Sequence, residues 1–290
     1  MTIRHLQQVI ESVPTSDGAG VKLRRSIGSQ RGLYVDPFLM LDEFSTDNPD
    51  DYIAGFPAHP HRGFETVTYM LDGHLLHEDH LGNKGDLKSG GAQWMTAARG
   101  IIHSEMPQQT EGRMRGFQLW VNLPAAEKMK SAWYRDIEPQ EIPQVTLADG
   151  GTAKIVAGSI NVAGVATDGV ITGHSTDPQY LDIELPNGAP LRYSISADYS
   201  AFIYLYEGTQ LQVGAAGEAR PLKARCAGVL SPGDEIHAHA DDGPVRFLLI
   251  AGKPIKEPVM QYGPFVMNTR EELDQAVRDY QNGTLAQPAA

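Results

Sequence analysis

Short alternating runs of apolar and polar residues, separated by turn residues, constrain the fold of this chain more than any other feature. Such runs predict antiparallel strands joined by hairpins. Turn pairs such as Asp72-Gly73 and Asn187-Gly188 bound several of them. We expect strands at residues 65–71, 117–123, 153–157, 179–184, 201–206, 228–230 and 245–250. The pattern predicts an all-β protein of barrels or sandwiches and argues against alternating strands and helices.

Two segments carry helical signals within this β pattern. Thr269, with Glu272 three residues later, forms a capping box that predicts a short C-terminal helix over residues 270–282. After Pro124, residues 125–130 are mostly good helix formers and predict a second short helix.

The length of the chain indicates two domains. With 290 residues, the chain is long enough for two domains that each bury a core. Residues 137–143 contain two prolines and two glutamates that do not suit a central strand, so we place a linker there. We therefore expect domains at residues 1–137 and 138–290. The second repeats the general β pattern of the first, without an exact internal repeat.

Composition and charge exclude several classes of protein. Hydrophobic residues make up 41% of the chain, and no run approaches the roughly 18 apolar residues that a membrane helix needs. The net charge of −12 opposes direct binding to nucleic acid or to an anionic membrane. Cys226 is the only cysteine, so one chain forms neither an internal disulfide nor a thiolate metal cluster. Metal chemistry would have to use imidazole and carboxylate groups.

The N-terminal residues give an expectation about location. They lack the basic region followed by an apolar run that marks a secretory signal, so we expect a cytoplasmic protein. The nucleus is a second expectation for a eukaryotic source. We expect a monomer.

Four residues form a candidate metal site. His59 and His61 are two positions apart, and so are His103 and Glu105. In a strand, such positions share a face, with Cα atoms roughly 6.6 Å apart. Two such pairs that face each other could close on one ion with three imidazoles and one carboxylate. This ligand set suits Fe(II), Mn(II), Ni(II), Cu(II) or Zn(II) better than Ca(II).

The remaining histidines leave other interpretations open. With 10 histidines in the chain, spacings of two could arise by chance on exposed strands. His74, His77 and His80 follow the turn at residues 72–73, and we expect a solvated hairpin there instead of a second metal site. The pair His237 and His239 has no second pair to complete it.

Two long segments resemble the signature motifs of the pirin family, within the cupin superfamily. They are HPHRGFETVTY at residues 59–69 and QWMTAARGIIHSEMP at residues 93–107. Further similarity lies in DPF at 36–38, QLWVNLP at 118–124 and YGPFVMNT at 262–269. The resemblance covers nearly the whole chain, and the two long motifs are highly specific.

The resemblance implies a fold and a ligand set. The fold would be a bicupin, two antiparallel β-barrels in tandem, with the metal in the N-terminal barrel and no metal site in the C-terminal one. In cupins generally, a glutamate four residues after the histidine pair completes the site, which would be Glu65. In pirins the carboxylate is the one at Glu105, so the resemblance implies the ligands His59, His61, His103 and Glu105. Glu65 would then orient an imidazole or form a surface salt bridge.

The resemblance also implies two alternative functions. The first is a metal-dependent dioxygenase, with Fe(2+) as its metal, that cleaves flavonols such as quercetin with dioxygen and uses Glu105 as the catalytic base. The second is a non-enzymatic, iron-dependent redox-sensing regulator that binds a transcription factor or a metabolic enzyme. Its contact surface would be the basic cluster around Lys22, Arg24 and Arg25, which could equally be a solvated strand edge.

Overall fold

The computed structural model describes residues 1–286, which form two compact units. The N-terminal unit contains residues 13–34, 38–139 and 255–286. The C-terminal unit contains residues 1–12, 35–37 and 140–254. The division into domains at residues 137 and 138 stays a prediction, and residues 287–290 of its second domain lie outside the described part.

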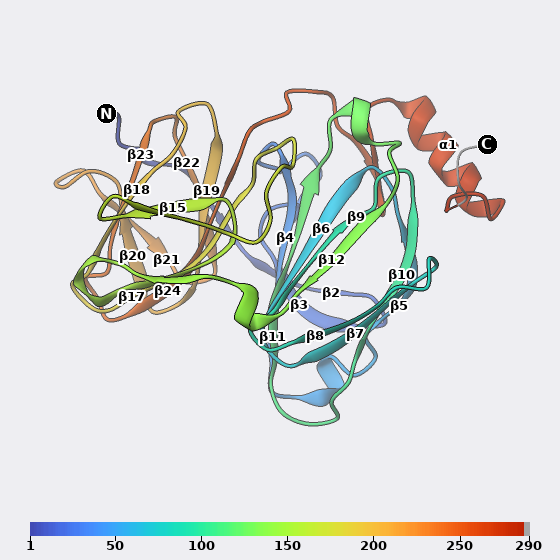
Figure 1. Cartoon of the computed structure of the whole chain (residues 1–290), viewed down its shortest axis with the longest axis horizontal. Coiled ribbons are helices and arrows are strands. Elements are labelled where there is room, and N and C mark those ends of the chain that lie inside the picture. The colour runs from blue at the N-terminus through green and yellow to red at the C-terminus, as the bar shows by residue number, and fades with distance from the viewer. Residues whose placement is uncertain (287–290) are drawn as a thin grey trace. The chain divides into compact units, whose positions relative to one another are not determined.

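Two sheets make up most of the N-terminal unit (Figure 1). Its elements are β2 (Val13–Asp17), β3 (Val21–Arg25), β4 (Phe38–Thr46), β5 (Phe56–His61), β6 (Phe64–Asp72), β7 (His74–Asp79), β8 (Lys84–Lys88), β9 (Ala92–Thr96), β10 (Ile101–Pro107), β11 (Met114–Asn122), β12 (Trp133–Ile137), β25 (Met260–Tyr262), β26 (Phe265–Met267) and α1 (Arg270–Gln281). One sheet has seven strands in the order β12-β9-β6-β11-β4-β3-β2, and the other has four in the order β5-β10-β7-β8. β25 and β26 pair separately with each other.

The C-terminal unit repeats the same architecture. Its strands are β1 (Leu6–Glu11), β13 (Gln144–Thr146), β14 (Thr152–Ala157), β15 (Ser159–Val162), β16 (Val165–Asp168), β17 (Gln179–Leu185), β18 (Pro190–Ser194), β19 (Ser200–Glu207), β20 (Gln210–Val213), β21 (Arg220–Lys223), β22 (Cys226–Leu230), β23 (Glu235–His239) and β24 (Val245–Gly252). A seven-stranded sheet has the order β1-β22-β19-β24-β17-β14-β13, and a four-stranded sheet has the order β18-β23-β20-β21. β15 and β16 form a two-stranded sheet.

The predicted all-β fold with a short C-terminal helix is confirmed, with one correction. Each unit has separate seven- and four-stranded sheets, so the closed barrels expected from the sequence are not formed. Proline explains part of this difference. β5 lies at the edge of its sheet and contains Pro57 and Pro60, which have no N–H group to pair with a further strand.

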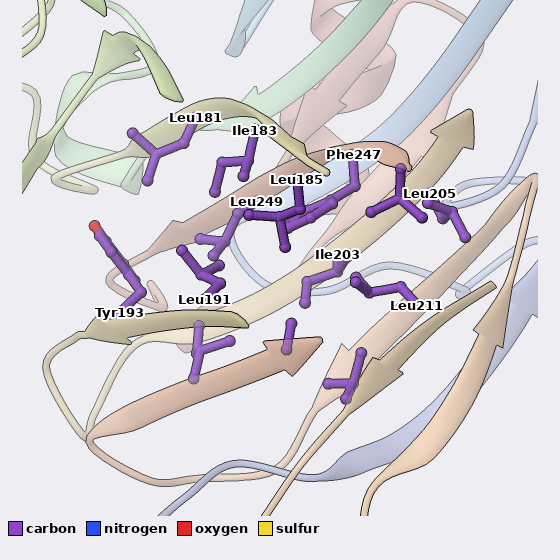
Figure 2. Close-up of a cluster of buried hydrophobic side chains, with 14 of the residues drawn as sticks. Leu181, Ile183, Leu185, Leu191, Tyr193, Ile203, Leu205, Leu211, Phe247 and Leu249 are labelled. Atoms are coloured by element: carbon purple, nitrogen blue, oxygen red, sulfur yellow. The ribbon is translucent and has the colours of Figure 1, made fainter. Parts of the chain in front are cut away.

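Side chains from both sheets fill the interior of the C-terminal unit (Figure 2). Alternate residues of β17, β19 and β24 project between the sheets and meet side chains of β18 and β20. These residues are Leu181, Ile183, Leu185, Leu191, Tyr193, Ile203, Leu205, Leu211, Phe247 and Leu249. On β23, Ile236 and Ala238 are the buried residues, so His237 and His239 lie on the opposite face of the strand. The side chains of His237 and His239 therefore do not enter the interior.

The two expected helices have different outcomes. The C-terminal helix is confirmed as α1, and both capping-box hydrogen bonds form, from Glu272 N to Thr269 Oγ1 (3.2 Å) and from Thr269 N to Glu272 Oε2 (2.9 Å). The prediction of a helix at 125–130 is wrong, because only a 3-10 turn forms, at Ala125–Glu127. The Lys130 carbonyl oxygen accepts from Arg99 N instead of continuing a helix. No helix within residues 1–286 is long and apolar enough to cross a membrane.

Candidate metal centre

Three histidine side chains converge in the N-terminal unit. His59 and His61 lie on β5, and His103 lies on the neighbouring strand β10, directly opposite His59. One ring nitrogen of each histidine lies within 4.8 Å of the other two. The ring centroids are 4.4 Å apart for His59 and His103 and 4.9 Å apart for His61 and His103. The two segments that the sequence proposes for the metal site are thus brought together by strand pairing.

A glycine at the end of β5 allows this arrangement. Gly63 has a φ of +92°, and a Cβ atom there would lie 1.9 Å from the Val266 carbonyl oxygen. The chain turns at this point from β5, in the four-stranded sheet, to β6, in the seven-stranded sheet. Only glycine fits such a turn and such a close approach without strain.

A hydrogen bond to the backbone fixes the tautomer of the His59 imidazole. Its Nδ1 lies 2.8 Å from the Pro57 carbonyl oxygen, which can only accept, so Nδ1 carries the proton. The lone pair of His59 is then on Nε2, which lies 3.0 Å from His61 Nε2.

Burial keeps the other two imidazoles neutral. His61 and His103 are 3% and 1% exposed, and burial, with the nearby histidine rings as a smaller cause, lowers the pKa of both well below the usual value. His103 Nε2 has no hydrogen-bond partner within the described chain. Neutral imidazoles with a free buried nitrogen fit a divalent transition metal, which would take up their lone pairs.

Glu105 lies on the same strand as His103 and is 5% exposed. Its Oε1 accepts from Thr68 Oγ1 at 3.1 Å. The carboxylate is not among the ligand atoms that lie within 4.8 Å of one another. Its role as fourth ligand and as base therefore stays a prediction.

For Glu65, one of the two expected roles is wrong. It is 1% exposed, and its carboxylate accepts from Thr96 Oγ1 (2.6 Å) and Trp94 Nε1 (3.3 Å), so it is not in a surface salt bridge. The turn at Gly63 separates β5 from β6, so Glu65 lies on a different strand from His59 and His61. Its expected role in orienting an imidazole stays a prediction.

His77 is a residue that the sequence analysis missed. It is 1% exposed, which makes the expected solvated hairpin wrong at this position. Its Nδ1 lies 3.2 Å from His103 Nδ1, and its ring stacks on Tyr134 with centroids 4.8 Å apart. The signal was present, because His77 and the buried Leu75 are two positions apart on β7.

A pocket of about 880 Å³ opens beside the histidines. Glu105, Thr68 and Gln118 provide polar groups in it, and Trp120 provides an aromatic wall whose ring packs against Phe64. Its other side chains include Leu23, Leu33, Leu39, Met40, Phe44, Phe56 and Leu75. Charged side chains, among them Arg25 and Asp42, also line it. A concave pocket with apolar walls and convergent polar groups is typical of a small-molecule site.

The expected basic cluster is partly neutralised. Arg25 lines the pocket and donates two hydrogen bonds of 2.7 Å to the buried Asp42, and a third of 2.9 Å to Asp17. Lys22 is exposed and Arg24 is half-buried. The guanidinium of Arg25 is therefore engaged within this unit.

Two repeated β units, one with three convergent histidines beside a pocket, are the features of a cupin protein with a candidate metal site. The chain belongs to the pirin family: the Pirin family model matches residues 20–121, and the model of the Pirin C-terminal cupin domain matches residues 180–286. The predicted bicupin family is thereby confirmed.

Similar proteins extend over nearly the whole chain. A Pseudomonas aeruginosa protein named "putative quercetin 2,3-dioxygenase" is 52% identical over 94% of this chain and 95% of its own length. A pirin-like protein of Caulobacter vibrioides is 46% identical over 98% of this chain and 99% of its own length. The crystal structure of quercetin 2,3-dioxygenase from Acinetobacter baumannii superposes with a TM-score of 0.87 at 29% identity, covering 98% of this chain and 99% of that one.

Proposed function

We propose that this protein is a metal-dependent dioxygenase that cleaves flavonols such as quercetin. The observation that carries the proposal is the convergence of His59, His61 and His103 beside a largely apolar pocket of about 880 Å³. The names of the Pseudomonas and Acinetobacter relatives support the same substrate class. The proposed ligands are the three histidines and Glu105, and the proposed metal is Fe(II).

Bound Fe(II) would act as a Lewis acid and as a redox centre for the reaction with dioxygen. The chain's own residues would bind and orient the flavonol. Pockets of roughly 300–1,000 Å³ hold ligands of this size, and the indole of Trp120 offers a flat surface for a fused aromatic ring. The Gln118 side chain adds a polar contact beside this surface.

Glu105 would accept the proton of the flavonol hydroxyl. Its carboxylate lines the pocket and is oriented by the Thr68 hydroxyl, which also lies 2.5 Å from Gln118 Oε1. A carboxylate held in this way is a suitable base, since it needs no rearrangement to receive the proton.

The regulator alternative has less support in this chain. A redox switch needs no substrate pocket, and Arg25, one of its proposed contact residues, is bound to Asp42 and Asp17. We therefore favour the enzyme.

The test is quercetin turnover by the protein reconstituted anaerobically with Fe(II) and then exposed to air. We expect loss of flavonol absorbance and release of carbon monoxide, and no turnover by metal-free protein. Glu105→Gln keeps the shape of the side chain but removes the base, and we expect turnover to fall by about 100-fold or more. Iron-loaded protein that leaves quercetin intact would refute the flavonol activity, and full activity of Glu105→Gln would refute the role of the base.

A further inference from the structure

A fourth histidine, also buried, lies behind the three that converge. His77 and His103 face each other from neighbouring strands, β7 and β10, with their Nδ1 atoms 3.2 Å apart and their ring centroids 4.9 Å apart. Both side chains are 1% exposed. His77 does not line the pocket, so it is not a residue that would touch the substrate.

The proton positions of this pair follow from chemistry. His103 has only Nε2 free, because Nδ1 faces His77. If Nε2 gives its lone pair to a metal, a neutral His103 must carry its proton on Nδ1. That proton can only be donated to His77 Nδ1, which must then be an acceptor, and the proton of a neutral His77 is on Nε2.

The surroundings of His77 suit this form. Its Nε2 makes no hydrogen bond within the described chain and lies 4.0 Å from Asp79 Oδ2, so the fully buried Asp79 side chain acts on it through charge alone. The Asp79 carboxylate is held by Leu81 N (2.9 Å), Asn83 N (3.0 Å) and Asn83 Nδ2 (2.7 Å). A fixed carboxylate beside Nε2 favours the proton on that nitrogen.

The ring of His77 is also held in its plane. It stacks on Tyr134 at an angle of 26°, and the Tyr134 hydroxyl donates to Asp136. Gln93 Nε2, on the neighbouring strand β9, donates to Asp136 Oδ1 at 2.9 Å. This bond fixes the Asp136 carboxylate that accepts from Tyr134.

We propose that His77 is a positioning residue that accepts a hydrogen bond from His103 Nδ1 and so fixes the tautomer in which His103 Nε2 binds a divalent metal. The inference rests on the metal site of the proposed function. It adds a layer of residues, from Asp79 through His77 to His103, that orients a ligand from behind.

The test measures Co(II) affinity by competition with a chromophoric chelator. His77→Phe keeps a ring that can stack on Tyr134 but removes the acceptor, and we expect affinity to fall about 10- to 100-fold. His77→Gln restores an acceptor oxygen, and we expect it to recover most of that loss. His74→Phe, on the same strand but half-buried and paired with Asp86, is the matched control and should bind Co(II) like the wild type.

A second measurement needs no variant. Imidazole ¹⁵N spectra of the wild-type protein with Zn(II) should show a protonated Nδ1 at His103 and a protonated Nε2 at His77. The opposite tautomer at His77, wild-type Co(II) affinity in His77→Phe, or no recovery in His77→Gln would each overturn the proposal. Both measurements omit flavonol and dioxygen, so they stand even if the protein does not cleave quercetin.

Discussion

Lys128, one of the buried cations, connects three segments around the histidine site. The side chain is 1% exposed, and Nζ donates to Asn122 Oδ1 (2.6 Å), to the Gly63 carbonyl (2.7 Å) and to the Val266 carbonyl (3.1 Å). Burial lowers the pKa of Lys128 to about 8, so the group is still an ammonium at neutral pH. Its three protons match the three acceptors.

We expect Lys128→Met to lower the free energy of unfolding by roughly 2–4 kcal/mol, because two buried carbonyls lose their donor. Urea unfolding at pH 7 measures the change. Lys130→Met is the control, because the pair of Lys130 with Glu127 is partly exposed, and its loss should cost under about 1 kcal/mol. Equal unfolding midpoints for the two variants would contradict the role of Lys128.

At the scale of residues, the sequence predicted the histidine cluster and missed its surroundings. The spacing of two on β5 and β10, together with the resemblance of both segments to the pirin motifs, identified the three histidines, because strand geometry is regular over such short distances. The burial of Glu65 was not predicted, because its contacts with Trp94 and Thr96 come from the neighbouring strand β9. His77 was misjudged because nearby turn residues and charges outweighed its alternation with Leu75.

At the scale of elements, an ion pair joins the C-terminal helix to the residue that follows the histidine-bearing strand β5. Arg62 follows the last residue of β5, and its Nη1 lies 2.6 Å from Asp279 Oδ2 on α1. Arg62 also donates to the Leu285 carbonyl at 3.2 Å. The Arg62 side chain is 4% exposed, so water cannot readily replace Asp279 as the partner of its guanidinium.

We expect Asp279→Asn to destabilise the protein by roughly 1–3 kcal/mol, because it leaves a buried guanidinium without its carboxylate. Thermal unfolding followed by circular dichroism measures the effect. Asp274→Asn, on the same helix, removes an exposed pair with Arg270 and should change stability by less than about 0.5 kcal/mol. A loss of stability in Asp274→Asn as large as that in Asp279→Asn would argue against the attachment.

The element-scale predictions succeeded where local signals were complete. Each expected strand range overlaps an observed strand, and the capping box placed α1 within one residue of its observed end. The segment after Pro124 has helix-forming residues but no side-chain cap, and it forms only a 3-10 turn. The membership of α1 in the N-terminal unit could not be predicted, because it depends on contacts such as that of Arg62 with Asp279, 217 residues apart.

At the scale of the whole molecule, the two units share a sheet architecture but differ in what they enclose. Both pair a seven-stranded sheet with a four-stranded one, although the sequence shows no exact repeat. An alternating pattern of apolar and polar residues is enough to specify such sheets, and many different apolar residues can fill the pattern. The C-terminal unit contains a leucine-rich cluster, whereas the N-terminal unit contains buried imidazoles. Acid sensitivity should therefore begin in the N-terminal unit.

The pH dependence of stability follows from His61 and His103, whose pKa values burial holds well below 6.5. Below pH 6.5 the unfolded chain binds protons that the folded metal-free protein does not, so stability falls as pH decreases. The free energy of unfolding at pH 5.5 should therefore be lower than at pH 7. All three tryptophans of the chain, Trp94, Trp120 and Trp133, belong to the N-terminal unit, so urea unfolding followed by their fluorescence reports on it. Replacing both histidines by Asn should abolish most of this loss, and a midpoint independent of pH in the wild type would show that the two imidazoles do not resist protonation.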